Sequence, residues 1–224
     1  MREREEKGST MKFYGYFRSS AAFRVRIAMN LKGISPDLAF IHLRRQEQTS
    51  PDYTRINPQQ LVPTLVLDDG TALAQSLAIL EYFEETHPEP PILPRDPAGR
   101  ARVRSLAMIP ACEIHPIQNL RVLGYLGKTY GQDEAGKQAW AQHWIDVGFT
   151  AYEASVAGHP KTGRFSHGDT PTIADMCLVP QVFNARRFGS DLAKYPTLMR
   201  IFDTCMAHPA FDRAQPSQQP DAEA

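Results

Sequence analysis

A cluster of five prolines divides this chain into two halves of different character. Pro88, Pro90, Pro91, Pro94 and Pro97 lie within ten positions of one another. Proline fixes φ and removes a backbone N–H, so a segment this rich in proline does not form a helix. We therefore predict a semi-rigid linker over residues 88–97. Short apolar runs alternate with helical patterns before this linker, whereas helical patterns dominate after it.

The first half begins with a strand, a helix and a second strand. Lys12–Phe17 is rich in aromatic residues, as strands are. Ala21–Lys32 has apolar residues at helical spacing, and Gly33 follows as a stop signal. Leu38–Leu43 reads as the second strand. Three such elements within about thirty residues have the size of a parallel βαβ unit.

A hairpin and a helix complete the first half. The apolar runs Thr64–Leu67 and Thr71–Ala74 are separated by Asp68-Asp69-Gly70, and an Asp-Gly pair between two such runs is a strong hairpin signal. Ser76–Thr86 has a helical pattern. The predicted order is βαβ, a connection, then ββα, which is characteristic of a thioredoxin-like domain when a helical bundle follows.

The second half is predicted to be entirely helical. The four helical segments are Ala98–Leu126, which Pro110 and Pro116 interrupt, then Gln132–Val156, Thr172–Phe188 and Lys194–Ala207. Thr172 and Asp175 form an acidic variant of the capping box. We thus expect an α/β domain over residues 11–87, the linker, and an all-helical domain over 98–212. Residues 1–10 and 213–224 are polar and are predicted to be disordered.

Composition excludes several classes of function. The chain has 25 basic and 25 acidic residues and a formal net charge of +0, which favours neither nucleic acid nor an anionic membrane as a partner. Apolar runs are too short for a transmembrane helix. Three widely spaced cysteines predict neither a disulfide framework nor a cysteine zinc site, and they suit a reducing cytoplasm. We also find no cluster of metal ligands in the sequence.

The junction of the first strand and first helix is the first candidate site. Ser19 and Ser20 precede the helix, where free N–H groups and a partial positive charge favour an anion. Their hydroxyls could donate hydrogen bonds to a thiolate and lower the pKa of that thiol. The alternative is that these serines only cap the helix.

Two further positions in the first half could hold a peptide. If the Val62–Pro63 bond is cis, the backbone of Val62 is exposed to an extended peptide that could pair as an added strand; the alternative is an ordinary trans proline. Gln75 and Ser76 begin a helix, and Ser76 could hold a carboxylate there. The alternative for Ser76 is again a simple cap.

Two groups of residues in the second half could bind an anionic ligand. His115 and Asn119 are four apart and can share one helical face, whereas Arg121 lies about 200° from Asn119 around an ideal helix. The two should not both reach one pocket of a single subunit unless Pro116 distorts the helix. A dimer could resolve this, with one of them serving the neighbouring subunit. Arg187 ends an apolar helix and could bind a carboxylate with two parallel hydrogen bonds. The simpler alternatives are a structural histidine and a solvated basic helix end.

Long motifs in both halves resemble those of zeta-class glutathione transferases. The matching segments are FRSS at 17–20, RVRIA at 24–28, NLKG at 30–33, NPQQLVP at 57–63, QSLAI at 75–79 and LVPQV at 178–182. They occur in the family's order, and the resemblance covers nearly all of Met11–Ala207. It implies a thioredoxin-like domain joined to a helical domain, usually as a homodimer. The implied activity is glutathione-dependent isomerisation of maleylacetoacetate, with maleylpyruvate isomerases among bacterial relatives.

The resemblance also implies roles for individual residues. The implied glutathione-binding residues are Ser19, Ser20, Ala21, Gln48, Val62, Gln75, Ser76, His115, Asn119 and Arg121. The implied catalytic residues are Arg18, Ser19, Ser20 and Arg187. The residues implied to bind the carboxylates of a small unsaturated diacid are Arg18, Arg121 and Arg187.

The chain departs from the family pattern at two positions. Many zeta enzymes have cysteine at Ala21 and tryptophan at Phe23. The missing cysteine puts in doubt the side activities linked to the class. It does not affect isomerisation, because the nucleophile is the sulfur of glutathione.

Two other hypotheses use the same fold, namely a conjugating transferase or dehalogenase and a non-catalytic binding module. Neither explains the carboxylate-binding arginines.

Overall fold

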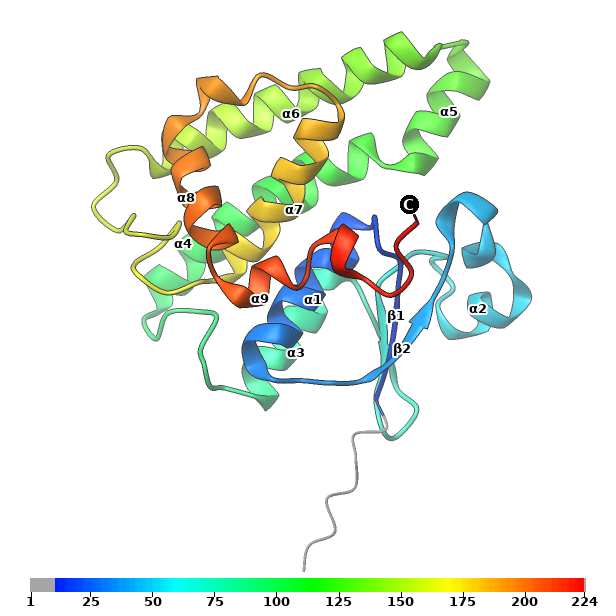
Figure 1. Ribbon diagram of the computed structural model, residues 1–224, viewed down its shortest axis with the longest axis horizontal. Helices are drawn as coiled ribbons and strands as arrows, with labels where there is room; N and C mark the ends of the chain where they lie inside the picture. The colour runs from blue at the N-terminus through cyan, green and yellow to red at the C-terminus, as the bar shows by residue number, and fades with distance from the viewer. Residues whose placement is uncertain (1–10, 224) are drawn as a thin grey trace, which may run out of the picture. The chain divides into compact units, whose positions relative to one another are not determined.

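The structure of the chain, a computed structural model, describes residues 11–223 in two units (Figure 1). The thioredoxin-like unit comprises residues 11–83 together with 213–223, and the helical unit comprises Glu84–Asp212. The predicted extension over residues 1–10 lies outside the described residues. None of the helices in residues 11–223 combines the length and the apolar character that crossing a bilayer requires.

A four-stranded mixed sheet forms the centre of the thioredoxin-like unit. Its strands are β1 (Lys12–Gly15), β2 (Asp37–Phe40), β3 (Thr64–Val66) and β4 (Ala72–Ala74). The order across the sheet is β2-β1-β3-β4. β1 pairs in parallel with β2 and antiparallel with β3, and β3 pairs antiparallel with β4. The predicted βαβ–ββα order is confirmed.

Helices α1 (Ser20–Lys32) and α3 (Ser76–Thr86) lie on one side of this sheet in Figure 1. Side chains from both helices and from β3 form the core, with Phe23, Ile27, Leu65 and Ile79 at most 1% exposed. α1 ends at Gly33, whose φ of 68° is the left-handed conformation that glycine adopts without strain. The core therefore holds α1 against the sheet, and Gly33 ends it.

The connection between β2 and β3 contains structure that the sequence patterns did not predict. Two 3-10 turns, η1 (Leu43–Arg45) and η2 (Glu47–Thr49), precede the short helix α2 (Pro51–Ile56). Ser50 caps α2 by accepting a hydrogen bond from the Tyr53 N–H at 3.3 Å. β2 ends at Phe40 and not at Leu43, since the chain turns there into η1.

The helical unit contains all the elements between Pro97 and Asp212. Its α-helices are α4 (Pro97–Met108), α5 (Leu120–Tyr130), α6 (Glu134–Val156), α7 (Ile173–Arg187), α8 (Pro196–Met206) and α9 (Pro209–Asp212). The predicted capping box of α7 is present, with Asp175 Oδ2 accepting from the Thr172 N–H at 2.8 Å. The predicted linker has no helix before α4. Ile92 within it is fully buried, and its N–H donates to Glu84 at 2.9 Å.

The segment predicted as one interrupted helix over Ala98–Leu126 changes its helical type three times. α4 continues into a π-helix, η3 (Ile109–Ile114), and then a 3-10 turn, η4 (His115–Gln118), before α5 begins. Proline cannot donate the backbone hydrogen bond of a regular α-helix. Pro110 and Pro116 each lie in the first two positions of the new segment, so each coincides with a change of hydrogen-bond pattern.

The C-terminal residues differ from the predicted disordered tail. Arg213–Glu223 belong to the thioredoxin-like unit and include a 3-10 turn, η6 (Pro216–Gln218). Ala214 is fully buried, and its carbonyl accepts from Arg26 Nε at 3.0 Å. Polar composition alone predicts disorder, because it does not reveal that these residues offer acceptors to buried donors elsewhere in the unit.

Candidate active site

The junction of β1 and α1 presents two serines in different surroundings. Ser19 is the N-cap of α1, and its hydroxyl oxygen accepts from the Ala22 N–H at 3.1 Å. Ser20 is the first residue of the helix and is 9% exposed. The capping alternative therefore describes Ser19, whereas Ser20 lies at the positive end of the helix dipole. Ala21 follows in the same first turn.

Arg18 precedes the two serines and is exposed. Its guanidinium lies 5.3 Å from the ring centroid of Phe17. An exposed arginine beside a helix N-terminus adds positive charge where the backbone N–H groups already favour an anion.

The start of α3 is a second polar position in the same unit. Ser76 is 4% exposed, and its hydroxyl accepts from Arg24 Nη1 at 3.2 Å. Gln75 before it has a φ of 72°, which is unusual for a residue other than glycine. Backbone conformations of this kind concentrate at functional sites, where the surrounding structure holds them in place. The side-chain nitrogen of Gln75, Nε2, donates to Gln59 Oε1 at 2.8 Å.

The Val62–Pro63 peptide is cis. The side chains of Tyr53 and Asn57 hold the loop before it, donating to the Leu61 carbonyl at 2.6 Å and 2.8 Å respectively. Asn57 also donates to Thr64 Oγ1 at 2.9 Å. Sequence reasoning did not predict these supporting roles, although Asn57 begins the NPQQLVP motif.

Gln48 in η2 supplies a test of whether the site suits glutathione. Its side-chain oxygen is buried and has no hydrogen-bond partner within residues 11–223. A buried acceptor without a donor is costly, so such an atom indicates a ligand or water that is still to be bound. Glutathione has the amide and ammonium donors that this oxygen lacks. The donors at the start of α1 likewise suit its thiolate and carboxylates.

In the helical unit, His115, Asn119 and Arg121 do not share one helix. His115 lies in η4, whereas Asn119 is the extended N-cap of α5, and its Oδ1 accepts from the Arg121 and Val122 N–H groups. The prediction that His115 and Asn119 share a helical face is therefore wrong, and so is the 200° separation of Asn119 and Arg121. Both hold only for a continuous ideal helix, and the change of helical type at Pro116 is the exception that the sequence allowed.

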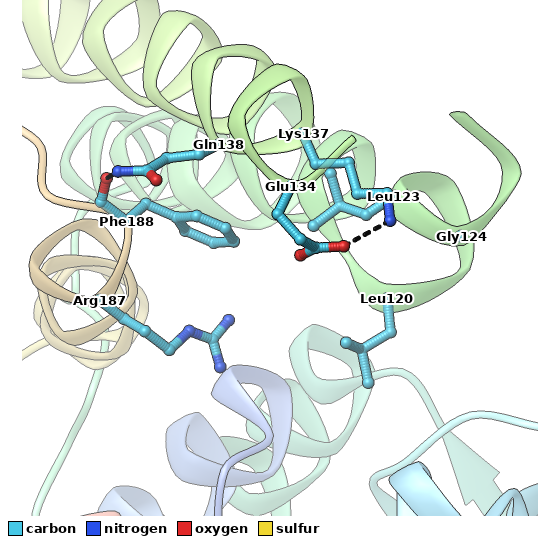
Figure 2. Close-up of a pocket in the computed structure, with 8 residues that line it drawn as sticks. All are labelled: Leu120, Leu123, Gly124, Glu134, Lys137, Gln138, Arg187 and Phe188. Carbon is cyan, nitrogen blue, oxygen red and sulfur yellow. Dashed lines mark hydrogen bonds and ion pairs between the residues drawn. The ribbon is translucent and has the colours of Figure 1, made fainter. Parts of the chain in front are cut away.

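A cavity of about 450 Å³ lies wholly within the helical unit. Eight residues of α5, α6 and the end of α7 line it, namely Leu120, Leu123, Gly124, Glu134, Lys137, Gln138, Arg187 and Phe188. Figure 2 shows the guanidinium of Arg187 pointing into the open space. Lys137 pairs with Glu134 at 2.7 Å on the other side.

The cavity brings together only one of the residues predicted for a site in the helical unit. Arg187 lines it, whereas His115, Asn119 and Arg121 are not among its lining residues. Arg187 Nη2 also donates to Asn184 Oδ1 at 3.4 Å, and its guanidinium lies 5.1 Å from the ring centroid of Phe188. Lys137 and Glu134 were missed, because an i,i+3 ion pair on a helix resembles any solvated face.

Within residues 11–223, no group of three His, Cys, Asp or Glu side chains is placed to hold a metal ion. None of the three cysteines, all of which lie in the described part of the chain, forms a disulfide. Cys177 and Cys205 are buried, whereas Cys112 is exposed.

Comparison with known proteins gives the chain a family. Residues 18–86 match the glutathione S-transferase N-terminal domain, and residues 129–209 match the glutathione S-transferase C-terminal domain. The maleylpyruvate isomerase of a Ralstonia species is 51% identical over 95% of this chain and 100% of its own length. A zeta-class glutathione S-transferase of Euphorbia esula is 42% identical over 95% of this chain and 92% of its own length.

A solved structure agrees with these relatives. The maleylacetoacetate isomerase of Methylobacterium extorquens AM1, solved with bound malonate and glutathione, has a TM-score of 0.92 and 44% sequence identity. The matched region covers 95% of this chain and 100% of the chain of that structure. This chain therefore belongs to the glutathione S-transferase family, in the zeta class that includes the maleylacetoacetate and maleylpyruvate isomerases.

Proposed function

We propose that this protein is a glutathione-dependent cis–trans isomerase that converts maleylacetoacetate to fumarylacetoacetate. Its isomerase relatives support the reaction class, and one of their structures holds glutathione. The observation that carries the proposal in this chain is the guanidinium of Arg187, which points into a cavity lined by both apolar and charged side chains. A planar cation in such a cavity suits a small carboxylate-bearing substrate.

The thioredoxin-like unit would hold glutathione. Gln48, Gln75 and Ser76 would bind the polar ends of glutathione. The backbone of Val62 would form hydrogen bonds with the peptide backbone of glutathione. Bound glutathione supplies a thiolate that adds reversibly to the double bond of the substrate and so permits rotation about it. Ser20 and the free N–H groups of α1 would stabilise the charged form of that thiol, which lowers its pKa.

Arginines would position the diacid. Arg187 would bind one carboxylate with two parallel hydrogen bonds, and Arg18 and Arg121 would supply further positive charge for the second carboxylate or for negative charge that develops during the reaction. His115 and Asn119 would also bind glutathione. The oxygen of Asn119 caps α5, so its amide nitrogen would be the atom that donates to the ligand.

Maleylpyruvate is the alternative substrate, because the Ralstonia relative at 51% identity is a maleylpyruvate isomerase. The two compounds share the cis-enone and a carboxylate beside it, so the same residues serve both. A conjugating transferase or dehalogenase would use the same glutathione site without needing Arg187.

A spectrophotometric assay separates these functions. Purified protein would be given maleylacetoacetate, maleylpyruvate and a chlorinated aromatic, each at saturating glutathione. We expect kcat/KM for either diacid to exceed that for the chlorinated aromatic by at least about a thousand-fold, because only the diacids engage the arginines. Faster turnover of the chlorinated aromatic would contradict the isomerase assignment, and the ratio for the two diacids identifies the preferred one.

We also propose that the protein acts as a homodimer in the cytoplasm. Large apolar side chains of the helical unit are exposed, including Met108 at 47%, Val147 at 50% and Tyr125 at 59%. Exposed groups of this kind mark association surfaces when they are contiguous. Light scattering after gel filtration should give twice the mass of the chain, and the mass of one chain would contradict the proposal.

A further inference from the structure

The C-terminal residues Arg213–Glu223, named here the C-terminal strap, lie on the thioredoxin-like unit. Figure 1 shows this segment, in red, beside β1 and the start of α1. At its far end, Glu223 Oε1 lies 2.7 Å from His42 Nε2 and 3.7 Å from Arg45 Nη2. The strap therefore has contacts at both of its ends, since Ala214 is fully buried at the other.

Phe17 is held from two sides, immediately before Arg18 and the serines. Its backbone N–H donates to Asp221 Oδ2 of the strap at 2.9 Å. Its carbonyl accepts from Arg26 Nη2 at 3.0 Å. Phe17 is 4% exposed, so its peptide groups have little access to water as an alternative partner.

Arg26 connects the same loop to the strap a second time. Its Nη1 donates to the Tyr16 carbonyl at 3.3 Å, and its Nε donates to the Ala214 carbonyl at 3.0 Å. Arg26 is 6% exposed. Burial lowers the pKa of its guanidinium to about 10, and the nearby charge of Asp221 acts in the opposite direction. The strap thus supplies both an acceptor and a negative charge to a buried cation.

These contacts lead directly to the serines. The Tyr16 carbonyl that Arg26 holds also accepts the backbone N–H of Ser19 at 2.9 Å. A short series of hydrogen bonds therefore connects Asp221, which accepts the Phe17 N–H, with Ser19, the N-cap of α1. A shift in the Phe17 peptide would move Ser19 and Ser20, because they follow it by two and three residues.

We propose that the C-terminal strap is a positioning element of the glutathione site, in which Asp221 holds the Phe17 amide and thereby sets the backbone that carries Arg18, Ser19 and Ser20. This inference rests on the proposed function of those residues. Asp221 touches neither ligand in this account and acts only through the loop.

The test compares three variants at the strap. Asp221→Ala removes the acceptor of the Phe17 N–H, whereas Asp221→Asn keeps an oxygen that can accept it. Glu223→Gln is the matched control, since it changes another strap carboxylate that contacts His42 and not the loop. Each variant is assayed for kcat, for KM of glutathione and of the diacid, and for the pKa of bound glutathione by thiolate absorbance. Calorimetry measures glutathione binding directly, and thermal unfolding measures stability.

Asp221→Ala should lower kcat/KM for glutathione about ten-fold, the size of one lost hydrogen bond. It should also raise the pKa of the bound thiol by about one unit, as the donors at α1 move away from the sulfur. KM for the diacid should change less than about two-fold, because Arg187 is untouched. Asp221→Asn should recover most of the loss, and Glu223→Gln should stay within about two-fold of the parent, as exposed ion pairs contribute little.

Two results would overturn the inference. The first is an Asp221→Ala protein that unfolds at lower temperature but keeps the parent's thiol pKa and glutathione affinity, because the strap would then only stabilise the fold. The second is an Asp221→Asn protein no better than Asp221→Ala, which would exclude the hydrogen bond as the cause. If the parent binds glutathione but isomerises neither diacid, the proposed function fails, and the binding and thiol pKa measurements still decide the role of the strap.

Discussion

Ser19 and Ser20 are adjacent, yet their surroundings give them different tasks. The oxygen of Ser19 already accepts the Ala22 N–H and so completes the first turn of α1. Ser20 lies inside the helix at its positive end and is nearly buried. Capping is a contribution to stability, whereas a hydroxyl near a bound thiolate contributes to reactivity.

Separate alanine substitutions should reveal this division. Ser19→Ala should lower the free energy of unfolding by about 1 kcal/mol, the usual cost of a lost N-cap. Ser20→Ala should lower kcat about 30-fold while changing KM for glutathione less than about three-fold, because a hydrogen bond to a charged group is worth about 2 kcal/mol. Urea unfolding and steady-state kinetics measure the two effects. Near-normal turnover of Ser20→Ala would contradict its role at the thiolate.

Lysine should not replace Arg187 without a loss of activity toward the diacid. Lysine keeps the charge but cannot form two parallel hydrogen bonds with one carboxylate. We expect Arg187→Lys to lower kcat/KM for the diacid about ten-fold or more. Arg186→Lys is the matched control, because the neighbouring Arg186 lies over the ring of Phe202 at 4.5 Å and does not line the cavity. Equal losses in both variants would contradict a specific role for Arg187.

Residue positions were predictable where a local rule determines them. Ser19 and Ser76 begin helices, and the start of a helix is visible in the sequence. The buried oxygen of Gln48 was not predictable, since its surroundings come from residues distant in the sequence. Asn119 was misplaced within a helix. Its preference for the N-cap position was the available signal, and the assumption of one continuous helix outweighed it.

At the scale of elements, α7 connects a buried capping box to the cavity. Asp175 is fully buried and accepts from Ser166 N–H at 2.8 Å and from both the N–H and the hydroxyl of Thr172. Arg187 is the last residue of the same helix. The cap therefore stabilises the element that carries the carboxylate-binding arginine.

Asp175→Ala should lower the free energy of unfolding by about 3 kcal/mol, because it leaves buried donors without acceptors. Asp203→Ala, at an exposed position of α8, should change it by less than about 0.5 kcal/mol. Denaturant titration measures both. A cost for Asp175→Ala no greater than that of Asp203→Ala would contradict the importance of this cap.

Most elements were predictable from spacing and turn chemistry, and the exceptions have physical reasons. The hairpin and α3 follow from Asp-Gly and from periodic apolar residues. α2 was missed because its six residues are too few to show a helical period. The π-helix at Pro110 was also missed, since a sequence shows that proline disturbs a helix but not which hydrogen-bond pattern replaces it.

At the scale of the whole molecule, the chain returns at its end to the unit in which it began. Arg213–Glu223 belong to the thioredoxin-like unit, although the whole helical unit precedes them in the sequence. The proline cluster predicted the division into two units, but composition near the C-terminus predicted only disorder. Long-range contacts such as that of Asp221 with the Phe17 N–H leave no local pattern.

Glutathione should stabilise the folded protein as a whole. A ligand that binds only the native state adds RT ln(1 + [L]/Kd) to its stability, which is about 2.7 kcal/mol at a hundred times Kd. The midpoint of thermal unfolding should therefore rise steadily with glutathione concentration. Free glycine at the same concentrations serves as the control. A midpoint that does not respond to glutathione would contradict a binding site on the native fold.

The most direct test of the account is the isomerisation rate of maleylacetoacetate with glutathione, with S-methylglutathione and with neither. S-methylglutathione retains the peptide and its carboxylates but has no free thiol. We predict rapid turnover with glutathione alone, no turnover above background in its absence, and competitive inhibition by the methylated peptide. Turnover that continues at the same rate without glutathione, or with the sulfur blocked, would contradict the central claim.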